Sequence, residues 1–145
     1  MLKDLSVKDF IYETSSDSPA PGGGSVAALS AATSAALIEM VANLTIGKKG
    51  YEEVTADMEK VKASAKEYKE KFINYIDEDS NSFNKIMEAF KLPKETEEEK
   101  ALRTKTVQLA FKGAANVPLN VGKDAFELLE LAKTVILKGN QNAVT

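Results

Sequence analysis

The chain contains 145 residues, of which 43% are hydrophobic and 28% are charged, and its formal net charge is −3. This length predicts a single domain, 1–145, and the interspersed charges argue against nucleic acid or an anionic membrane as a partner. Cysteine is absent, which excludes disulfides and thiol chemistry. Histidine is also absent, so we expect no metal site. Any acid–base chemistry must then come from Asp, Glu, Lys or Tyr.

The first predicted element is a short amphipathic helix over Val7–Thr14, with Ser6 as its N-cap. Its apolar residues Phe10 and Ile11 are expected to face inward. The residues before it, Met1–Leu5, lack the continuous apolar core of a signal peptide. We therefore expect a soluble, cytoplasmic protein.

A glycine-rich turn follows, because Pro19–Ser25 reads PAPGGGS. Consecutive glycines at Gly22, Gly23 and Gly24 let a ligand approach the main chain closely, and Ser25 is expected to cap the next helix. The first turn of that helix would then offer N–H groups to a carboxylate, a phosphate or an electron-rich ring. The alternative is a flexible loop with an ordinary serine cap. Known phosphate-binding motifs do not fit, since no Lys-Ser/Thr follows the last glycine and no strand precedes the first.

The second predicted helix, Val26–Ile46, is apolar on nearly every side, which is typical of a central buried helix. It is just long enough to raise the question of a membrane span, but Glu39, Asn43 and several hydroxyl groups argue against one. Glu39 and Asn43 lie one turn apart on a face of small residues. They are either an inter-helix hydrogen-bonding pair or part of a ligand site.

Two long helices complete the predicted fold. The first runs from Glu52 to about Phe90, and the second begins at a capping box, Thr96–Glu99, and ends at Gly139-Asn140. Apolar residues recur in both at alternating spacings of three and four, as in a helical bundle. With no strand signal anywhere, we predict an all-α bundle of two long antiparallel helices packed on a buried Ala-rich helix.

Several charged residues break these patterns. Asp79 occupies a core position of the first long helix. It is a functional carboxylate or a structural ion pair, or the apolar face opens to solvent there, whereas Asp77 is expected to be solvated. Arg103 extends the apolar face of the last helix and could approach Asp79, or could merely extend across the bundle end. Lys48 and Lys49 either complement a helix dipole or bind an anionic tail.

Six segments, spread over nearly the whole chain, resemble segments that occur in the same order in one known family. They are PAPGGGS at 19–25, EMVANLT at 39–45, KKGY at 48–51, residues 77–83 around Asp79, VPL at 117–119 and GNQN at 139–142. The family is the formiminotransferase-cyclodeaminase C-terminal domain, with formimidoyltetrahydrofolate cyclodeaminases and methenyltetrahydrofolate cyclohydrolases. The resemblance implies an all-helical fold, a homodimer and a folate site by the glycine-rich turn. Since the family's pattern continues past Thr145, the chain is expected to be truncated at its C-terminus.

Both reactions of that family act on the one-carbon unit between N5 and N10 of tetrahydrofolate, and the resemblance implies no other cofactor. We predict a cyclodeaminase, with cyclohydrolase as the alternative, and Asp79 and Glu39 as catalytic acid–base groups. The predicted substrate-binding residues are Gly22, Gly23, Gly24, Ser25, Asn43, Lys48, Lys49, Arg103 and Asn140. A non-catalytic helical interaction module is the competing hypothesis, and it predicts no folate binding.

Overall fold

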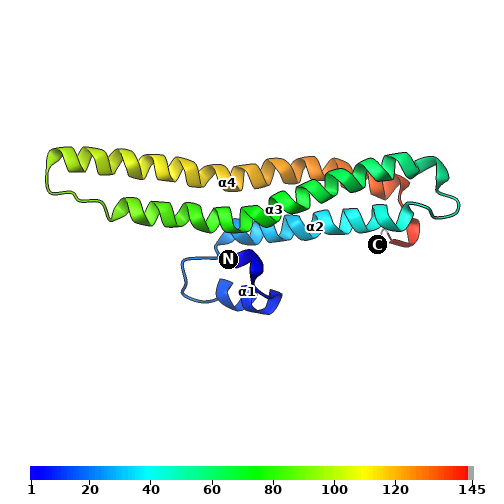
Figure 1. The fold of residues 1–145 in the computed structure, drawn as a ribbon, viewed down its shortest axis with the longest axis horizontal. Helices are drawn as coiled ribbons and strands as arrows, with labels where there is room; N and C mark the ends of the chain where they lie inside the picture. The colour runs from blue at the N-terminus through cyan, green and yellow to red at the C-terminus, as the bar shows by residue number, and fades with distance from the viewer. Residues whose placement is uncertain (144–145) are drawn as a thin grey trace. The chain divides into compact units, whose positions relative to one another are not determined.

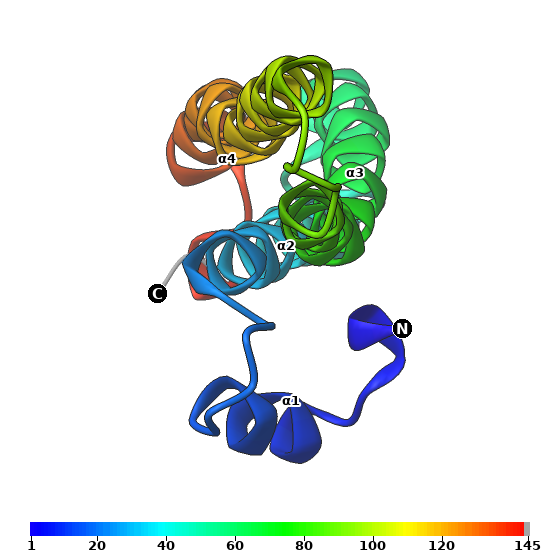
Figure 2. The same cartoon turned by 90° about the vertical axis from the view of Figure 1, so that its left-hand side faces the viewer.

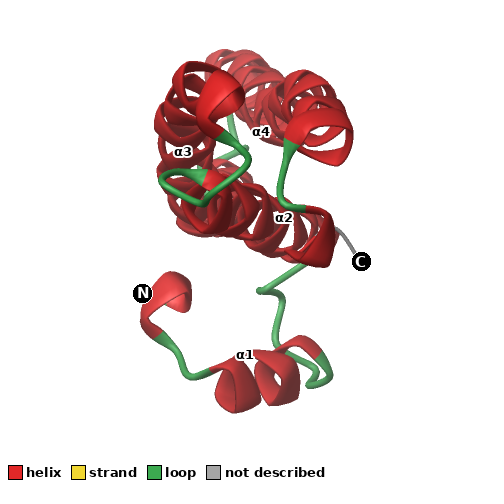
Figure 3. Ribbon diagram, turned by 90° about the vertical axis from the view of Figure 1, so that its right-hand side faces the viewer, coloured by secondary structure: helices red, strands yellow, loops and turns green. Residues whose placement is uncertain are grey.

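The computed structural model describes residues 1–143, and every regular element in that part of the chain is helical (Figure 1 and Figure 3). Four α-helices follow one another: α1 (Val7–Thr14), α2 (Gly23–Thr45), α3 (Thr55–Phe90) and α4 (Glu97–Lys138). Short 3-10 turns cover Leu2–Asp4, Glu52–Val54 and Gln141–Ala143. The predicted all-α class with two long helices is confirmed.

The chain divides into two compact units, and each of the helices α2, α3 and α4 contributes to both. The first unit combines residues 1–28 with 74–121, and the second combines residues 29–73 with the chain from 122 onward.

In the first unit, local capping rules explain where two helices begin. The Ser6 side chain accepts a hydrogen bond of 3.1 Å from the Asp9 N–H at the start of α1. At the start of α4, Thr96 and Glu99 exchange the two hydrogen bonds of a capping box, both 3.1 Å long. Both predicted caps are confirmed.

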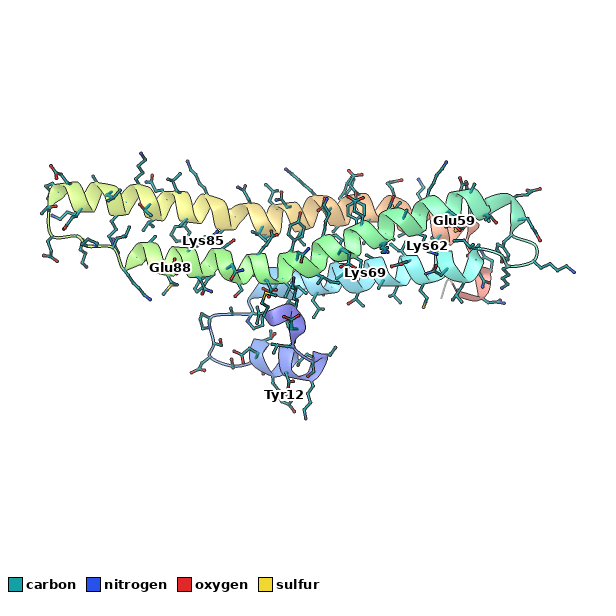
Figure 4. All side chains as sticks on the ribbon, viewed as in Figure 1. Tyr12, Glu59, Lys62, Lys69, Lys85 and Glu88 are labelled. Carbon is teal, nitrogen blue, oxygen red and sulfur yellow. The ribbon has the colours of Figure 1, made fainter. Side chains whose placement is uncertain are left out.

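The buried face of α1 is narrower than the sequence predicted. Phe10 is buried, but Ile11 is 60% exposed, so the prediction that both face inward is wrong. Tyr12 on the same helix is also exposed (Figure 4). The loop from α1 to α2, visible in Figure 2, contains a cis peptide bond between Ala20 and Pro21.

In the second unit, α3 and α4 run antiparallel. Lys138 pairs with Asp57 at 2.5 Å, and Lys71 pairs with Asp124 at 3.3 Å, so the residue number rises along one helix as it falls along the other. The hydrogen bond from Lys138 holds the pKa of the Asp57 carboxyl below its usual value. Burial raises the pKa of Tyr68, whose ring stacks on Phe72.

Helix α2 begins earlier than predicted and is buried on one side only. Its buried residues are Ser25, Ala28, Ala31, Ala32, Ala35, Ile38, Val41, Ala42 and Thr45. Leu37, Met40 and Leu44 are each at least 44% exposed, which corrects the expectation of a fully buried helix. Within the described residues, α2 alone is long and apolar enough to cross a membrane by length and composition, a test that core helices of soluble proteins also pass.

Candidate functional site

The N-terminus of α2 is capped by a side chain from another helix. Asp79 of α3 accepts a 2.9 Å hydrogen bond through Oδ2 from the backbone N–H of Ser25, the third residue of α2. Carboxylates are stabilised at this end of a helix, because its first N–H groups lack intrahelical partners and carry partial positive charge. The core position of Asp79 is thus explained by a polar partner on α2.

Ser25 does not cap α2 with its own side chain, which corrects the sequence prediction. The side chain is fully buried, and its hydroxyl oxygen lies 2.9 Å from the Ile76 carbonyl oxygen and 3.0 Å from Asp79 Oδ2. The hydroxyl can donate its one proton to either acceptor. When the hydroxyl donates to Asp79, Ser25 makes two hydrogen bonds to Asp79 Oδ2, one from its backbone N–H and one from its hydroxyl.

Gly24 leaves the space that Asp79 occupies. A Cβ atom at this position would lie 2.1 Å from Asp79 Oδ1 and 2.5 Å from its Cγ. Contacts this short do not occur between real side chains, so alanine cannot replace Gly24 while Asp79 stays in place. A Cβ at Gly22 or Gly23 would meet nothing within 4 Å. Of the three glycines, Gly24 alone is required by a close contact among the described residues.

A hollow of about 220 Å³ opens beside this contact. The glycine-rich turn forms one side of it, and residues of α3 and α4 form the other. Its lining residues are Pro19, Ala20, Gly22, Gly23, Gly24, Asp79, Ser80, Phe83, Ile86 and Ala114. The structure therefore brings the three predicted glycines together with Asp79 around one small cavity, where a carboxylate meets an apolar wall.

Asp77 is buried, which corrects the expectation that it is solvated. It is 8% exposed, and its Oδ1 accepts a 3.3 Å hydrogen bond from the Lys3 backbone N–H. The Lys3 ammonium donates to Asn74 at 2.9 Å and lies 3.9 Å from Asp77 Oδ2. The N-terminal segment thus covers a second face of α3, and no periodicity within α3 itself could have revealed this.

Glu39 belongs to the second unit, where it bonds to another helix, as the inter-helix alternative expected. The ammonium of Lys69, labelled in Figure 4, donates to Glu39 Oε2 at 2.5 Å, and both side chains are largely buried. Asn43 is exposed. Sequence reasoning missed Lys69 because 30 residues separate it from Glu39.

Lys48 and Asn140, also in the second unit, are brought together as a polar cluster. The Lys48 ammonium donates to Asn140 Oδ1 at 2.5 Å and lies 5.5 Å from the centre of the Tyr51 ring. Asn140 is buried, and its backbone N–H and side-chain amide bond to Thr45 and Leu44. The Lys48 cation is thus held by neutral groups, an arrangement that suits an anionic ligand.

Arg103 and Lys49, like Asn43, lie outside these clusters. Arg103 donates to the Phe90 carbonyl oxygen at 3.2 Å and stacks over the Phe90 ring, 11 positions along α3 from Asp79. At 1.5 Å per residue this separation is about 16 Å along the helix, so Arg103 does not join the Asp79 cluster. Lys49 is exposed. Among the described residues, no group of three or more acidic side chains is arranged to hold a metal ion.

Known proteins resemble the chain over nearly its whole length. The formiminotransferase-cyclodeaminase family model matches residues 6–145. Methenyltetrahydrofolate cyclohydrolase of Methylorubrum extorquens is 41% identical over 145 residues, which are 100% of this chain and 70% of that protein. Formimidoyltransferase-cyclodeaminase of Mus musculus is 32% identical over 144 residues, which are 99% of this chain but only 27% of that longer protein. The crystal structure of formiminotetrahydrofolate cyclodeaminase from Thermotoga maritima superposes with a TM-score of 0.83 at 34% identity, covering 99% of this chain and 67% of that one.

Proposed function

Because the chain belongs to the formiminotransferase-cyclodeaminase family, we propose that it is a folate-dependent enzyme of one-carbon metabolism. Its substrate would carry a one-carbon unit between N5 and N10 of tetrahydrofolate. The observation that carries this proposal is the Asp79 carboxylate, which is fixed by Ser25 at the edge of a hollow and occupies space that only a glycine at position 24 leaves free. The competing interaction-module hypothesis explains the contact between Asp79 and Ser25 as a helix cap, but it assigns no ligand to the hollow.

Cyclodeamination is the reaction we propose first. The N10 nitrogen attacks the formimidoyl carbon bound to N5, loses its proton, and the carbon then expels ammonia to leave the methenyl cation. A carboxylate beside the reacting carbon can take the N10 proton and return one to the departing amine, and it attracts the cationic product. Asp79 is the residue that we assign to these steps. We assign no such step to Glu39, because its carboxylate is already paired with Lys69.

Cyclohydrolysis is the second candidate, and the 41% identity to a methenyltetrahydrofolate cyclohydrolase favours it. In that reaction a carboxylate activates the water that attacks the methenyl carbon, and the ring opens to the formyl product. The same residue can serve both reactions, since each places a proton acceptor beside the same carbon. The two reactions differ in that cyclodeamination releases ammonia, whereas cyclohydrolysis consumes water.

The other predicted binding groups, outside the glycine-rich turn, have no assigned role in this proposal. Lys48 belongs to the second unit and follows the C-terminus of α2, whereas Asp79 lies at the N-terminus of that helix. The glycine-rich turn would lie against the one-carbon unit. No metal is required, and tetrahydrofolate itself carries the reacting group.

The assay that tests the function supplies each substrate separately to the purified chain. Cyclodeaminase activity predicts release of one ammonium ion for each methenyl chromophore formed from formimidoyltetrahydrofolate. Cyclohydrolase activity predicts decay of the methenyl chromophore faster than in buffer alone, without ammonium. A folded protein that does neither contradicts the proposal.

We also propose that the chain forms a homodimer, as the family resemblance implies. In the second unit, α2 and α4 line an apolar groove of about 480 Å³ that contains no charged side chain. Leu37 and Ile136 on its walls are more than half exposed, and such surfaces commonly mark interfaces. Light scattering is expected to give twice the chain mass of 15.7 kDa. The Ile136→Lys variant is expected to shift the mass toward that of one chain, and a monomeric wild type would contradict the proposal.

A further inference from the structure

The two carboxyl oxygens of Asp79 have different surroundings. Oδ2 lies 2.9 Å from the backbone nitrogen of Ser25 and 3.0 Å from its hydroxyl oxygen. Oδ1 accepts no hydrogen bond within the described chain, yet it is not a buried atom, because the buried side-chain oxygen that lacks a partner there belongs to Asp77. Asp79 lines the hollow at the glycine-rich turn. Oδ1 is therefore the oxygen that a molecule in that hollow can reach.

A proton carried by Asp79 fits on Oδ1 rather than on Oδ2. The Ser25 N–H belongs to the backbone of α2 and cannot turn away from Oδ2. A proton on Oδ2 would compete with that N–H, whereas a proton on Oδ1 leaves Oδ2 free to accept both bonds from Ser25. In the proposed cyclodeamination, the bond from the carbon to N10 forms and N10 passes its proton to Oδ1. The bond from the carbon to the amino nitrogen then breaks as Oδ1 returns that proton and ammonia leaves, so the carboxylate ends as it began.

The Ser25 hydroxyl acts on Asp79 and not on a molecule in the hollow. Ser25 is fully buried and is not among the residues that line the hollow. Its hydroxyl has two acceptors within reach, Asp79 Oδ2 and the Ile76 carbonyl oxygen. An ionised carboxylate is the stronger acceptor, and the Ile76 carbonyl already has a donor within α3. The hydroxyl thus adds a second bond to Oδ2, from a different direction than the N–H, and so fixes where Oδ1 points.

We propose that Ser25 is a positioning residue, whose hydroxyl orients Asp79 so that Oδ1 faces the reacting carbon, an inference that rests on the proposed function. The sequence predicted Ser25 as a substrate-binding residue, but its buried side chain acts through Asp79 instead. Misplacing a reacting group by about 1 Å can cost about 10²-fold in rate. Loss of the hydroxyl is therefore expected to lower kcat and to leave KM nearly unchanged.

Steady-state kinetics of the full chain with formimidoyltetrahydrofolate and with methenyltetrahydrofolate test the assignment. Ser25→Ala is expected to lower kcat by about 10- to 100-fold, the usual effect of losing a hydrogen bond to a charged group. Ser25→Cys keeps nearly the same side-chain volume but offers only a weak S–H donor, so it is expected to lower kcat without the packing defect. Ser82→Ala is the matched control, because it removes a hydroxyl that donates to the Glu78 carbonyl of α3 and does not line the hollow. Its kcat and KM are expected to equal those of the wild type.

The outcomes separate the positioning role from the function. If the wild type turns over a folate substrate and Ser25→Cys, folded by circular dichroism, keeps the wild-type kcat, the positioning assignment is wrong and the proposed function stands. A rise in KM at unchanged kcat would also contradict the assignment, because it would place Ser25 in substrate binding. If the folded wild type turns over neither substrate, the proposed function fails and the positioning role with it.

Discussion

Gly24→Ala is expected to abolish turnover in a protein that still folds. The new Cβ would lie 2.1 Å from Asp79 Oδ1, so the Asp79 carboxyl must leave the N-terminus of α2 and lose its bonds to Ser25. Overpacking of this kind costs about 1–3 kcal/mol. Alanine recovers part of that cost, because it favours a helix over glycine by about 1 kcal/mol. Steady-state kinetics and urea unfolding of the same preparation measure both effects.

Gly122→Ala is the matched control for that experiment. It places the same methyl group inside α4, at a residue that does not line the hollow, where nothing lies within 4 Å. We expect full activity and a gain of about 0.5–1 kcal/mol in the free energy of unfolding. The two variants should therefore differ by about 1–3 kcal/mol in stability. Equal activities in the two variants would show that the position of Asp79 does not matter for catalysis.

Asp79→Asn is expected to lower kcat by about 10²–10⁴-fold, the usual contribution of a positioned acid–base group. The amide keeps an oxygen that can accept the Ser25 N–H, but it cannot take up a proton. Since Asn and Asp are comparable helix caps, the free energy of unfolding should change little. Asp79→Ala should lose the same activity and about 1 kcal/mol of stability as well.

The comparison of these two variants separates catalysis from structure. If Asp79 only caps α2, Asp79→Asn retains wild-type turnover and Asp79→Ala loses activity only as far as it loses fold. A pH profile of kcat for the wild type adds a second readout, because an acid–base role gives a titration limb that the Asn variant lacks. Turnover by Asp79→Asn at the wild-type rate would remove Asp79 from the mechanism.

Local sequence rules predicted much of the fold. The Ser6 cap and the Thr96–Glu99 capping box depend on neighbours within a few residues. The three-and-four spacing of apolar residues likewise predicted the long helices. Asp79 was identified because a carboxylate stood where that spacing required an apolar side chain.

The errors concern partners that are distant in sequence. Helix α2 starts at Gly23 rather than after Ser25 because its cap comes from Asp79, 54 residues away. Asp77 was expected to be solvated, but the N-terminal segment covers it through Lys3, 74 residues away. Periodicity describes the faces of one helix and cannot show which other segment covers each face. The choice between the two folate reactions also depends on groups that these patterns do not identify.

Titration calorimetry of the wild-type chain with tetrahydrofolate tests the central claim most directly. The account predicts saturable binding, with affinity reduced in Gly24→Ala and unchanged in Gly122→Ala, because only the former displaces Asp79 from the hollow. No heat of binding from a protein that is helical by circular dichroism would contradict the folate assignment and favour the interaction module.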